Sequence, residues 1–255
     1  MPSGRLPLSA CIITKDEEER LPQCLRSVSF CEDVVVLDSG STDSTLKVAE
    51  SMGARTFIEQ WRGFGPQKQR AMELARYDTV LLLDADEVLE DSARDEIAGV
   101  MGSQSATAYS FRRRGYIGGR PIRHSGWWPD RVVRLVDRRR CRMEGNIHER
   151  VIVDGSTGSL KSIIHHYSFR DYSHMIEKMD IYSDYTSEKL LQEGRSAGPL
   201  SPVTHSISMF LRTYILKAGL LDGLDGLVIS LLNAGGTFFK YAKLLDKKRR
   251  PEGEG

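Results

Sequence analysis

The stretch Thr79-Val-Leu-Leu-Leu-Asp-Ala-Asp-Glu87 decides the fold expected for this chain. A short apolar run that ends in polar residues is typical of a buried strand. Asp84 and Asp86 follow this run directly. Because side chains alternate along an extended chain, both carboxylates point roughly the same way and could share a divalent cation with phosphate oxygens and water. The alternative is a solvated acidic turn, which the position after a buried strand disfavours.

Similar apolar runs precede this stretch, and segments with helical patterns separate them. We expect strands at 8–14, 34–37, 55–58 and 79–83, and helices from about 22, at 44–52 and at 67–75. Strands that alternate with helices indicate an α/β fold with a mostly parallel sheet covered on both faces. Ligands bind such sheets at the carboxyl ends of the strands. Thr14, Asp38 and Asp84 are therefore expected at one edge.

The pattern changes after residue 100, and this change gives the expected division of the chain. Shorter strands are expected at 109–111, 132–136 and 151–153, followed by a helix at 171–192 and a linker rich in glycine, proline and serine at 194–202. We expect a donor half at 1–100, an acceptor half at 101–193 and a helical appendage at 203–250.

Charge is balanced over the whole chain but not along it. The 255 residues hold 36 basic and 35 acidic side chains, for a net charge of +1, which argues against a nucleic-acid binder. Residues 1–100 hold 11 basic and 19 acidic side chains, whereas residues 112–150 hold 12 arginines and four acids. Arginine suits phosphate and carboxylate ligands, so this cluster could hold acceptor phosphates; a solvated basic face is the alternative.

The appendage is apolar in short runs and ends in basic residues. None of its runs reaches the ~20 apolar residues of a spanning helix. A pair of helices lying in the membrane interface fits this pattern, with the basic end near anionic headgroups. A helical hairpin packed on protein is the alternative. The start of the chain lacks the apolar segment of a signal peptide, which favours the cytoplasm.

Two further residues suit a nucleotide pocket. Asp38, at the end of a strand, could accept the imide N–H of uracil; the alternative is a helix N-cap. The hydroxyl groups of Ser39, Ser41 and Thr42 could cap the helix instead and leave Asp38 free. Lys68 fits a contact with phosphate or base, although a lysine near a helix start is often just solvated.

These residues stand in motifs that resemble family 2 glycosyltransferases of the GT-A fold. The motifs are Ile12-Ile-Thr-Lys-Asp-Glu-Glu18, Val35-Val-Leu-Asp-Ser-Gly-Ser-Thr-Asp43, Gly63-Phe-Gly-Pro-Gln-Lys68 and Leu81-Leu-Leu-Asp-Ala-Asp-Glu87. Later segments are similar to bacterial lipopolysaccharide core heptose β-1,4-glucosyltransferases: Gly126-Trp-Trp-Pro-Asp-Arg131, Ile147-His-Glu-Arg150, His166-Tyr-Ser-Phe169 and Asp222-Gly-Leu-Asp-Gly-Leu227.

The resemblance implies a role for each matching residue on the donor side. Nucleotide-sugar binding would fall to Thr14, Glu17, Asp38, Lys68 and Asp84. Lys68 stands where many members have arginine, so it keeps the charge but loses the bidentate fork. A Mg²⁺ or Mn²⁺ ion would be bound by Asp86, with Asp84 and His148 as further candidates. A hydrogen-bonded structural role is the alternative for His148, whereas His165 and His166 are expected to be structural.

The acceptor side is less defined. An inverting transfer needs a carboxylate that takes the proton of the attacking hydroxyl, and Asp130 and Glu149 are the two candidates. An ion pair with a neighbouring arginine is the alternative for either one. Acceptor binding is expected from Trp127, Trp128, Arg123 and Arg131, although one tryptophan is also expected to belong to the core.

The resemblance thus implies an inverting, metal-dependent hexosyltransferase. It would move a sugar, with UDP-glucose as the expected donor, to an inner-core heptose or a similar membrane glycolipid. It would act as a peripheral protein on the cytoplasmic face of the inner membrane, without nucleic acid. Two alternatives stay open: transfer to polyprenyl phosphate, and a scaffold that binds nucleotide sugars without turnover.

Overall fold

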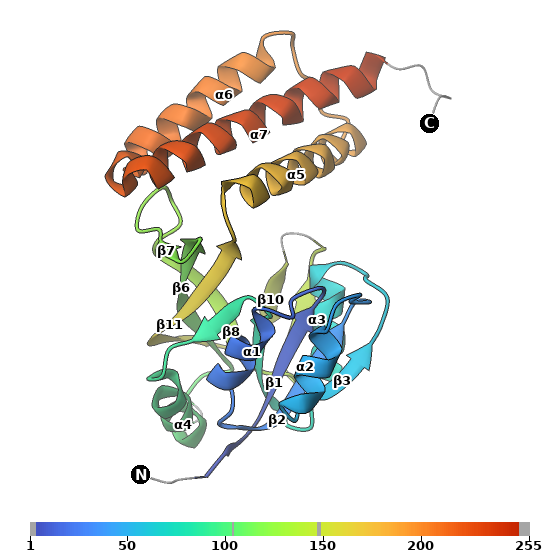
Figure 1. Cartoon of the computed structure of the whole chain (residues 1–255), viewed down its shortest axis with the longest axis vertical. Helices are drawn as coiled ribbons and strands as arrows, with labels where there is room; N and C mark the ends of the chain where they lie inside the picture. Colours follow the sequence, from blue (N-terminus) through green and yellow to red (C-terminus); the bar gives the residue numbers. More distant parts are fainter. Residues whose placement is uncertain (1–3, 104, 147–148, 250–255) are drawn as a thin grey trace. The chain divides into compact units, whose positions relative to one another are not determined.

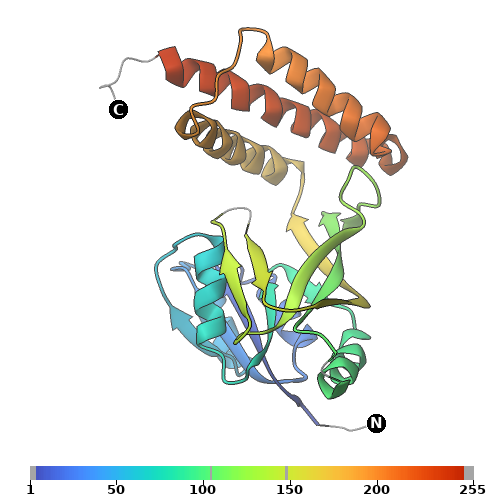
Figure 2. The same ribbon diagram turned by 180° about the vertical axis from the view of Figure 1, so that it is seen from behind.

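The computed structural model describes residues 4–103, 105–146 and 149–249, which form two compact units. Unit 1 comprises residues 1–113 and 130–166, and unit 2 comprises residues 114–129 and 167–255. The expected appendage does not stand alone, because the helix expected at 171–192 groups with it in unit 2. Figures 1 and 2 show the chain from opposite sides.

Unit 1 begins with alternating strands and helices, close to the expected ranges. These elements are β1 (Leu6–Thr14), α1 (Leu21–Ser27), β2 (Cys31–Asp38), α2 (Thr45–Ser51), β3 (Arg55–Ile58), α3 (Phe64–Glu73), β4 (Thr79–Asp84), β5 (Glu87–Leu89) and α4 (Ala93–Ser103). The strands pair in the order β3-β2-β1-β4, all parallel. In register, Thr14 lies beside Asp38, and Ile13 lies beside Asp84. The expected polar edge therefore forms.

Both faces of these strands are covered, as their aliphatic composition requires. Along β1, Ala10 and Ile12 face a cluster that includes residues of α1, α2 and α4. Cys11 and Ile13 face a second cluster with Ala71 of α3. Figures 1 and 2 show α1 and α2 on one face of the sheet and α3 on the other. Alternation along each strand thus supplies two apolar layers.

The rest of the sheet is largely antiparallel. It uses β6 (Ala108–Ile117), β7 (Arg120–Pro121), β8 (Asp130–Asp137) and β11 (Thr157–Phe169), so that the strand order continues β4-β8-β6-β11-β5. A separate antiparallel pair joins β9 (Cys141–Glu144) to β10 (Arg150–Val153). The predicted fold class, a mixed, mostly parallel GT-A-like sheet flanked by helices with a C-terminal helical part, is confirmed, and the parallel strands are those of the first part of the chain.

Unit 2 is mainly helical. It contains α5 (Tyr172–Gln192), α6 (Ser201–Leu211), a π-helical turn η1 (Arg212–Leu216), a 3-10 turn η2 (Gly219–Asp222) and α7 (Gly223–Arg249). Both α5 and α6 pack against α7. Ile117, Ile122, Met175 and Ile229 form its buried cluster. Within the described part of the chain, no helix combines the length and the apolar character needed to cross a membrane.

Candidate functional site

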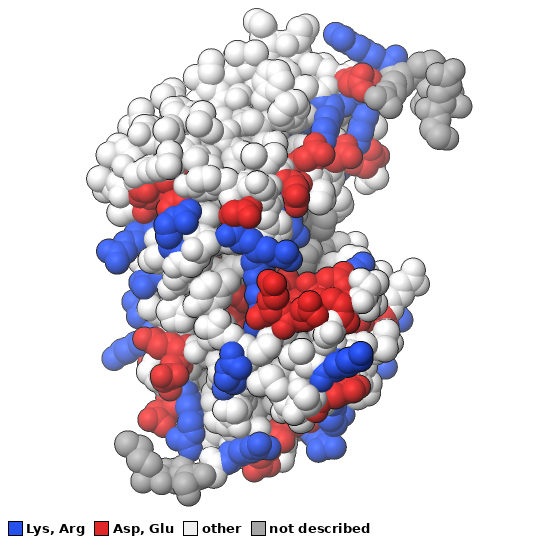
Figure 3. Space-filling view, viewed as in Figure 1, with Lys and Arg blue, Asp and Glu red and all other residues white. Residues whose placement is uncertain are grey.

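Hydrogen bonds join the loops that follow β1 and β2 at the carboxyl ends of the strands. The N–H of Asp16 donates to Ser41 Oγ at 2.8 Å, and the N–H of Thr42 donates to Asp16 Oδ1 at 2.7 Å. The N–H of Glu17 donates to Thr45 Oγ1 at 2.9 Å. These reciprocal bonds hold an acidic rim over this edge of the sheet, and Figure 3 shows acidic side chains gathered on this face of the molecule.

Asp38 is buried, and its carboxylate accepts hydrogen bonds from the turn that follows it. Asp38 Oδ2 accepts the N–H groups of Gly40 at 2.8 Å and of Ser41 at 2.7 Å, and Oδ1 accepts the Ser41 hydroxyl. The expectation that the hydroxyls of the turn cap the next helix and leave Asp38 free is therefore wrong: α2 has no side-chain cap at Ser44. The physical reason is proximity, because Asp38 is the nearest strong acceptor for the N–H groups of this turn. Binding of uracil by Asp38 stays a prediction.

Two other donor-side candidates lie next to this turn. The Thr14 hydroxyl is buried and has no hydrogen-bond partner among the residues that the structure describes. A buried, unsatisfied hydroxyl is costly, so a ligand that completes it is favoured. Glu17 lies 3.7 Å from Arg20 in an ion pair, and its carbonyl oxygen accepts the first N–H bonds of α1.

Lys68 is buried between two carboxylates, not solvated. Only 1% of its side chain is exposed, and its Nζ lies 2.8 Å from Asp84 Oδ1 and 2.8 Å from Glu149 Oε1. Asp84 also accepts from Arg134 Nη2, at 3.0 Å. Two cations therefore already neutralise Asp84. As arranged, Asp84 does not fit a direct metal ligand, because a metal ion would have to displace Lys68 or Arg134.

Glu87 and Arg134, which the motif reading did not single out, form the centre of the charged network. Glu87 is fully buried, and its Oε1 lies 2.7 Å from Arg134 Nη2 and 3.3 Å from Arg113 Nη1. Burial by itself would raise the pKa of Glu87, but Arg134, together with His166 and Arg113, outweighs burial and holds that pKa well below its ordinary value. Glu87 is therefore expected to be ionised at neutral pH, and it orients both arginines.

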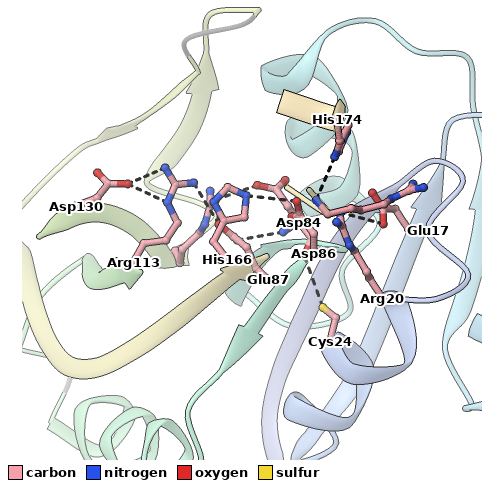
Figure 4. A network of polar contacts seen from close by, with 12 residues as sticks. Glu17, Arg20, Cys24, Asp84, Asp86, Glu87, Arg113, Asp130, His166 and His174 are labelled. Atoms are coloured by element: carbon pink, nitrogen blue, oxygen red, sulfur yellow. Dashed lines mark hydrogen bonds and ion pairs between the residues drawn. The ribbon is translucent and has the colours of Figure 1, made fainter. Parts of the chain in front are cut away.

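His166, which was expected from the sequence to be structural, lies beside Asp86. Its Nε2 is 3.4 Å from Asp86 Oδ2 (Figure 4), because the β11–β5 pairing sets His166 opposite Glu87. Burial opposes both ionised forms, but their mutual attraction prevails: the pKa of His166 is raised and that of Asp86 is lowered. The only signal in the sequence was the motif position of His166.

The residues around Asp86 fit a divalent metal ion in part. A carboxylate oxygen and an imidazole nitrogen are suitable donors, and in a nucleotide complex phosphate oxygens and water would complete the shell. Among residues 4–103, 105–146 and 149–249, no group of three or more histidine, cysteine, aspartate or glutamate side chains is arranged to hold a metal ion. The candidate ligand His148 lies outside the described residues.

Both candidate bases are tied to the same network by cations. Asp130 Oδ2 lies 2.9 Å from Arg113 Nε and 2.7 Å from Nη2 (Figure 4), and Glu149 accepts from Lys68. The side chain of Asp130 is 39% exposed, against 19% for Glu149. The structure thus brings both carboxylates into one network. Arg131 is exposed on β8 opposite Arg112 and takes no part in the network contacts just described.

The remaining acceptor-side candidates lie in a loop of unit 2. Trp127 packs against Phe169 at 5.7 Å between ring centroids and borders the buried cluster, whereas Trp128 lies under the guanidinium of Arg114 at 4.2 Å. The N–H of Arg123 donates to Asp222 Oδ1 at 3.1 Å. Trp127 is therefore largely a core residue, as expected of one of the two.

Comparison with known proteins identifies the family. The model of the family described as glycosyl transferase family 2 matches residues 9–168. An uncharacterized glycosyltransferase of Rickettsia typhi is 28% identical over 251 residues, covering 93% of this chain and 86% of that protein. The lipopolysaccharide core biosynthesis glycosyltransferase LpsC of Rhizobium meliloti is 29% identical over 267 residues, covering 97% of this chain and 96% of LpsC.

A solved structure agrees on the fold. The crystal structure of S. aureus TarS has a TM-score of 0.50 and 14% identity, covering 96% of this chain and 56% of TarS, which is a likeness of fold alone. The family match spans more than half of the chain and includes most of β1, all of β2 and β4, and the charged network around Asp84, Asp86 and Glu87. On these grounds the chain belongs to glycosyl transferase family 2 and is a glycosyltransferase.

Proposed function

We propose that this glycosyltransferase moves a hexose, with inversion, from a UDP-sugar to a heptose of the lipopolysaccharide inner core or to a similar membrane glycolipid. UDP-glucose is the proposed donor. The observation that carries the proposal is the network in which Asp86 with His166, Asp84 with Lys68, and the two candidate bases meet around one buried glutamate. The relationship to LpsC over nearly the full length of both chains supports the acceptor class.

On the donor side, the strand ends would bind the nucleotide. The unsatisfied Thr14 hydroxyl and the adjacent Asp38 turn suit the base and ribose, which carry several hydrogen-bonding groups. Asp84 suits a ribose hydroxyl better than a metal ion, because Lys68 and Arg134 already balance its charge. Lys68 could move toward the diphosphate when the nucleotide binds.

On the leaving-group side, Asp86 and His166 would hold the divalent ion. A bound Mg²⁺ or Mn²⁺ would neutralise the charge that develops on the departing diphosphate. The raised pKa of His166 favours the protonated imidazole, which attracts the Asp86 carboxylate. To ligate, His166 would have to be neutral, so metal binding would release its proton.

The bond-forming step needs one base. The acceptor hydroxyl oxygen attacks the anomeric carbon as the bond from that carbon to the diphosphate oxygen breaks, and the carboxylate takes the hydroxyl proton. We propose Asp130, because its side chain is the more exposed of the two candidates and Arg113 orients it through contacts with Oδ2. Glu149 would then position Lys68.

Nucleotide release tests the reaction. Purified protein is incubated with Mg²⁺ or Mn²⁺, a panel of UDP-hexoses and lipopolysaccharide cores truncated at the heptose, and UDP is measured. We expect release that depends on the acceptor, and a loss of about 100-fold or more in Asp86→Ala. The matched control is Asp91→Asn, an exposed acid before α4. Calorimetric titration of Mn²⁺ in the presence of UDP should show weaker binding for His166→Ala.

Three results would contradict parts of this proposal. Acceptor-dependent release that survives in Asp86→Ala would overturn the metal assignment. UDP release with polyprenyl phosphate as the only effective acceptor would show that this lipid, and not a heptose, is the acceptor. No release with any donor and acceptor, alongside intact UDP binding, would favour a scaffold that binds nucleotide sugars.

For location, we propose the cytoplasmic face of the inner membrane, with the protein peripheral. A UDP-sugar in solution and a membrane-held acceptor would meet at that surface.

A further inference from the structure

We propose that the outward surface formed by α6, η1, η2 and the first half of α7, named here the apolar surface, binds the interface of an anionic lipid bilayer. The inference goes beyond the transfer reaction and does not depend on it, since the surface belongs to unit 2 and needs neither donor nor acceptor.

The composition of this segment is the first observation. Residues 200–239 contain four charged side chains in forty positions, Arg212, Lys217, Asp222 and Asp225, whereas 28% of the whole chain is charged. Helices that face water normally carry charged residues on the outer side. In the view of Figure 3, few acidic or basic side chains lie over α6 and the first half of α7.

The exposed positions form continuous stripes. On α6 and η1, Val203, Ile207, Leu211 and Ile215 are four residues apart and all exposed. On α7, the exposed side chains of Leu224, Leu231 and Phe238 are seven residues apart. Residues at these spacings share one helix face. The apolar face of each helix therefore includes an outward stripe, contrary to the pattern of a solvated surface.

The turn between the helices is the most exposed part. The exposed fractions are 81% for Leu216, 64% for Leu221 and 66% for Leu224. Side chains that project this far make few contacts within the protein. They suit insertion into a fluid boundary between headgroups and acyl chains.

The charges of the segment are divided by sign. Asp222 accepts the N–H groups of Arg123 and His124 and the Ser125 hydroxyl, and it lies 3.0 Å from His124 Nδ1. Asp225 pairs with Arg120 and accepts the Tyr172 hydroxyl. Both acids thus face their own unit. Arg212 and Lys217 are exposed. The charge left at the edge of the apolar surface is cationic, which complements anionic headgroups.

The basic end of α7 contributes less than its sequence suggests. Lys243 lies 2.7 Å from Asp180, and Lys247 lies 2.9 Å from Glu188, so α5 neutralises both lysines. Lys248 and Arg249 are exposed at the end of the helix. We therefore assign the lipid contact chiefly to the apolar surface with Arg212 and Lys217, not to the basic run.

Vesicle sedimentation with the full chain tests the proposal. Vesicles of phosphatidylglycerol and phosphatidylethanolamine in equal parts are compared with vesicles of phosphatidylcholine. We expect the wild-type protein to bind the anionic vesicles. The triple variant Leu216→Ser, Leu221→Ser, Leu224→Ser should bind them more weakly, by about tenfold or more. Arg212→Gln with Lys217→Gln should reduce the preference for anionic lipid. The matched control is Ile58→Ser on β3, since Ile58 is 65% exposed outside this surface.

Two measurements keep the test decisive. Hydrogen exchange on the unmodified protein should show protection of residues 203–224 when anionic vesicles are added, whether or not a variant folds. Light scattering of the protein alone gives its oligomeric state. A monomer that stays in the supernatant with both vesicle types overturns the proposal. A dimer that the triple variant dissociates, without vesicle binding, shows that a second copy covers the surface. UDP release on a soluble acceptor fragment is scored separately.

Discussion

At the scale of single residues, the carboxylates of Asp84, Asp86 and Glu87 have different roles because different cationic side chains contact them. Glu87 contacts Arg113 and Arg134, which lower its pKa. Asp84 contacts Lys68 and Arg134, and Asp86 contacts His166. The three lie within four positions of the chain, so their roles are set by contacts from distant strands and not by local sequence.

The two candidate bases can be separated by isosteric variants. We expect Asp130→Asn to lower kcat by about 10²- to 10⁴-fold, because it removes the proton acceptor. Glu149→Gln should lower kcat less, because Lys68 would keep its contact with Asp84 when the charge of residue 149 is removed. Steady-state kinetics of UDP release measure both. A larger loss in Glu149→Gln would exchange the two assignments.

Away from the site, Asp33 is expected to make stability depend on pH. Its side chain is 1% exposed; burial by itself would raise its pKa, but hydrogen bonds from Arg55, Ser9 and the N–H of Arg76 lower it. The ionised form therefore stabilises the fold fully above the ordinary pKa of aspartate, and this stabilisation is lost as pH falls through the lowered folded value. We expect Asp33→Asn to lower the free energy of unfolding by about 3 kcal/mol at neutral pH.

Urea unfolding at several pH values measures this effect. The difference between wild type and Asp33→Asn should narrow below about pH 4. Asp91→Asn, an exposed acid, should show neither effect. A difference that stays constant down to pH 3 would contradict the assignment to the Asp33 carboxylate.

At the scale of elements, a close approach of backbone positions the Lys68–Glu149 contact. A Cβ on Gly65 would lie 1.9 Å from the carbonyl oxygen of Gly145. The N–H of Phe64 also donates to the carbonyl of Asn146, at 2.8 Å. The start of α3 therefore lies directly on Gly145 and Asn146, which follow β9, and only glycine fits at position 65.

We expect Gly65→Ala to cost about 2 kcal/mol or more, because backbone atoms must separate. It should also lower kcat, since Lys68 and Glu149 would move apart. Thermal unfolding and UDP release measure the two effects. The matched control is Gly99→Ala in α4, where a Cβ meets nothing within 4 Å and helix propensity favours alanine by up to about 1 kcal/mol. Equal stability and equal rates of UDP release for Gly65→Ala and Gly99→Ala would contradict this explanation.

At the scale of the whole molecule, unit 2 is assembled from segments far apart in the chain. Ile117 and Ile122 pack with Ile229, and Asp222 and Asp225 hold residues 120–125. The C-terminal helices are therefore part of the fold around the tryptophan loop. A chain without them would lack both an apolar partner and the acceptors of that loop.

We expect deletion of residues 203–255 to unfold unit 2, not simply to release a membrane anchor. Hydrogen exchange over residues 114–129 should become fast, and the protein should lose solubility. Ile229→Ala is the milder variant and should cost about 2–4 kcal/mol, because it leaves a cavity in a small cluster. A truncated protein that stays soluble, with residues 114–129 still protected, would show that the loop folds without the helices.

The sequence by itself determined the parallel strands, their order of appearance and the polar edge with Thr14, Asp38 and Asp84, because period-two burial and strand-end polarity are local signals. Only the tertiary structure decided which cation meets which carboxylate. Lys68 lies 16 and 81 positions from its two partners, and His166 reaches Asp86 through an antiparallel pairing. Charge pairing depends on distance in space, and no local pattern encodes it across such separations. The same holds for the apolar surface: the sequence showed an apolar tail, but only packing decided which apolar side chains stay outside.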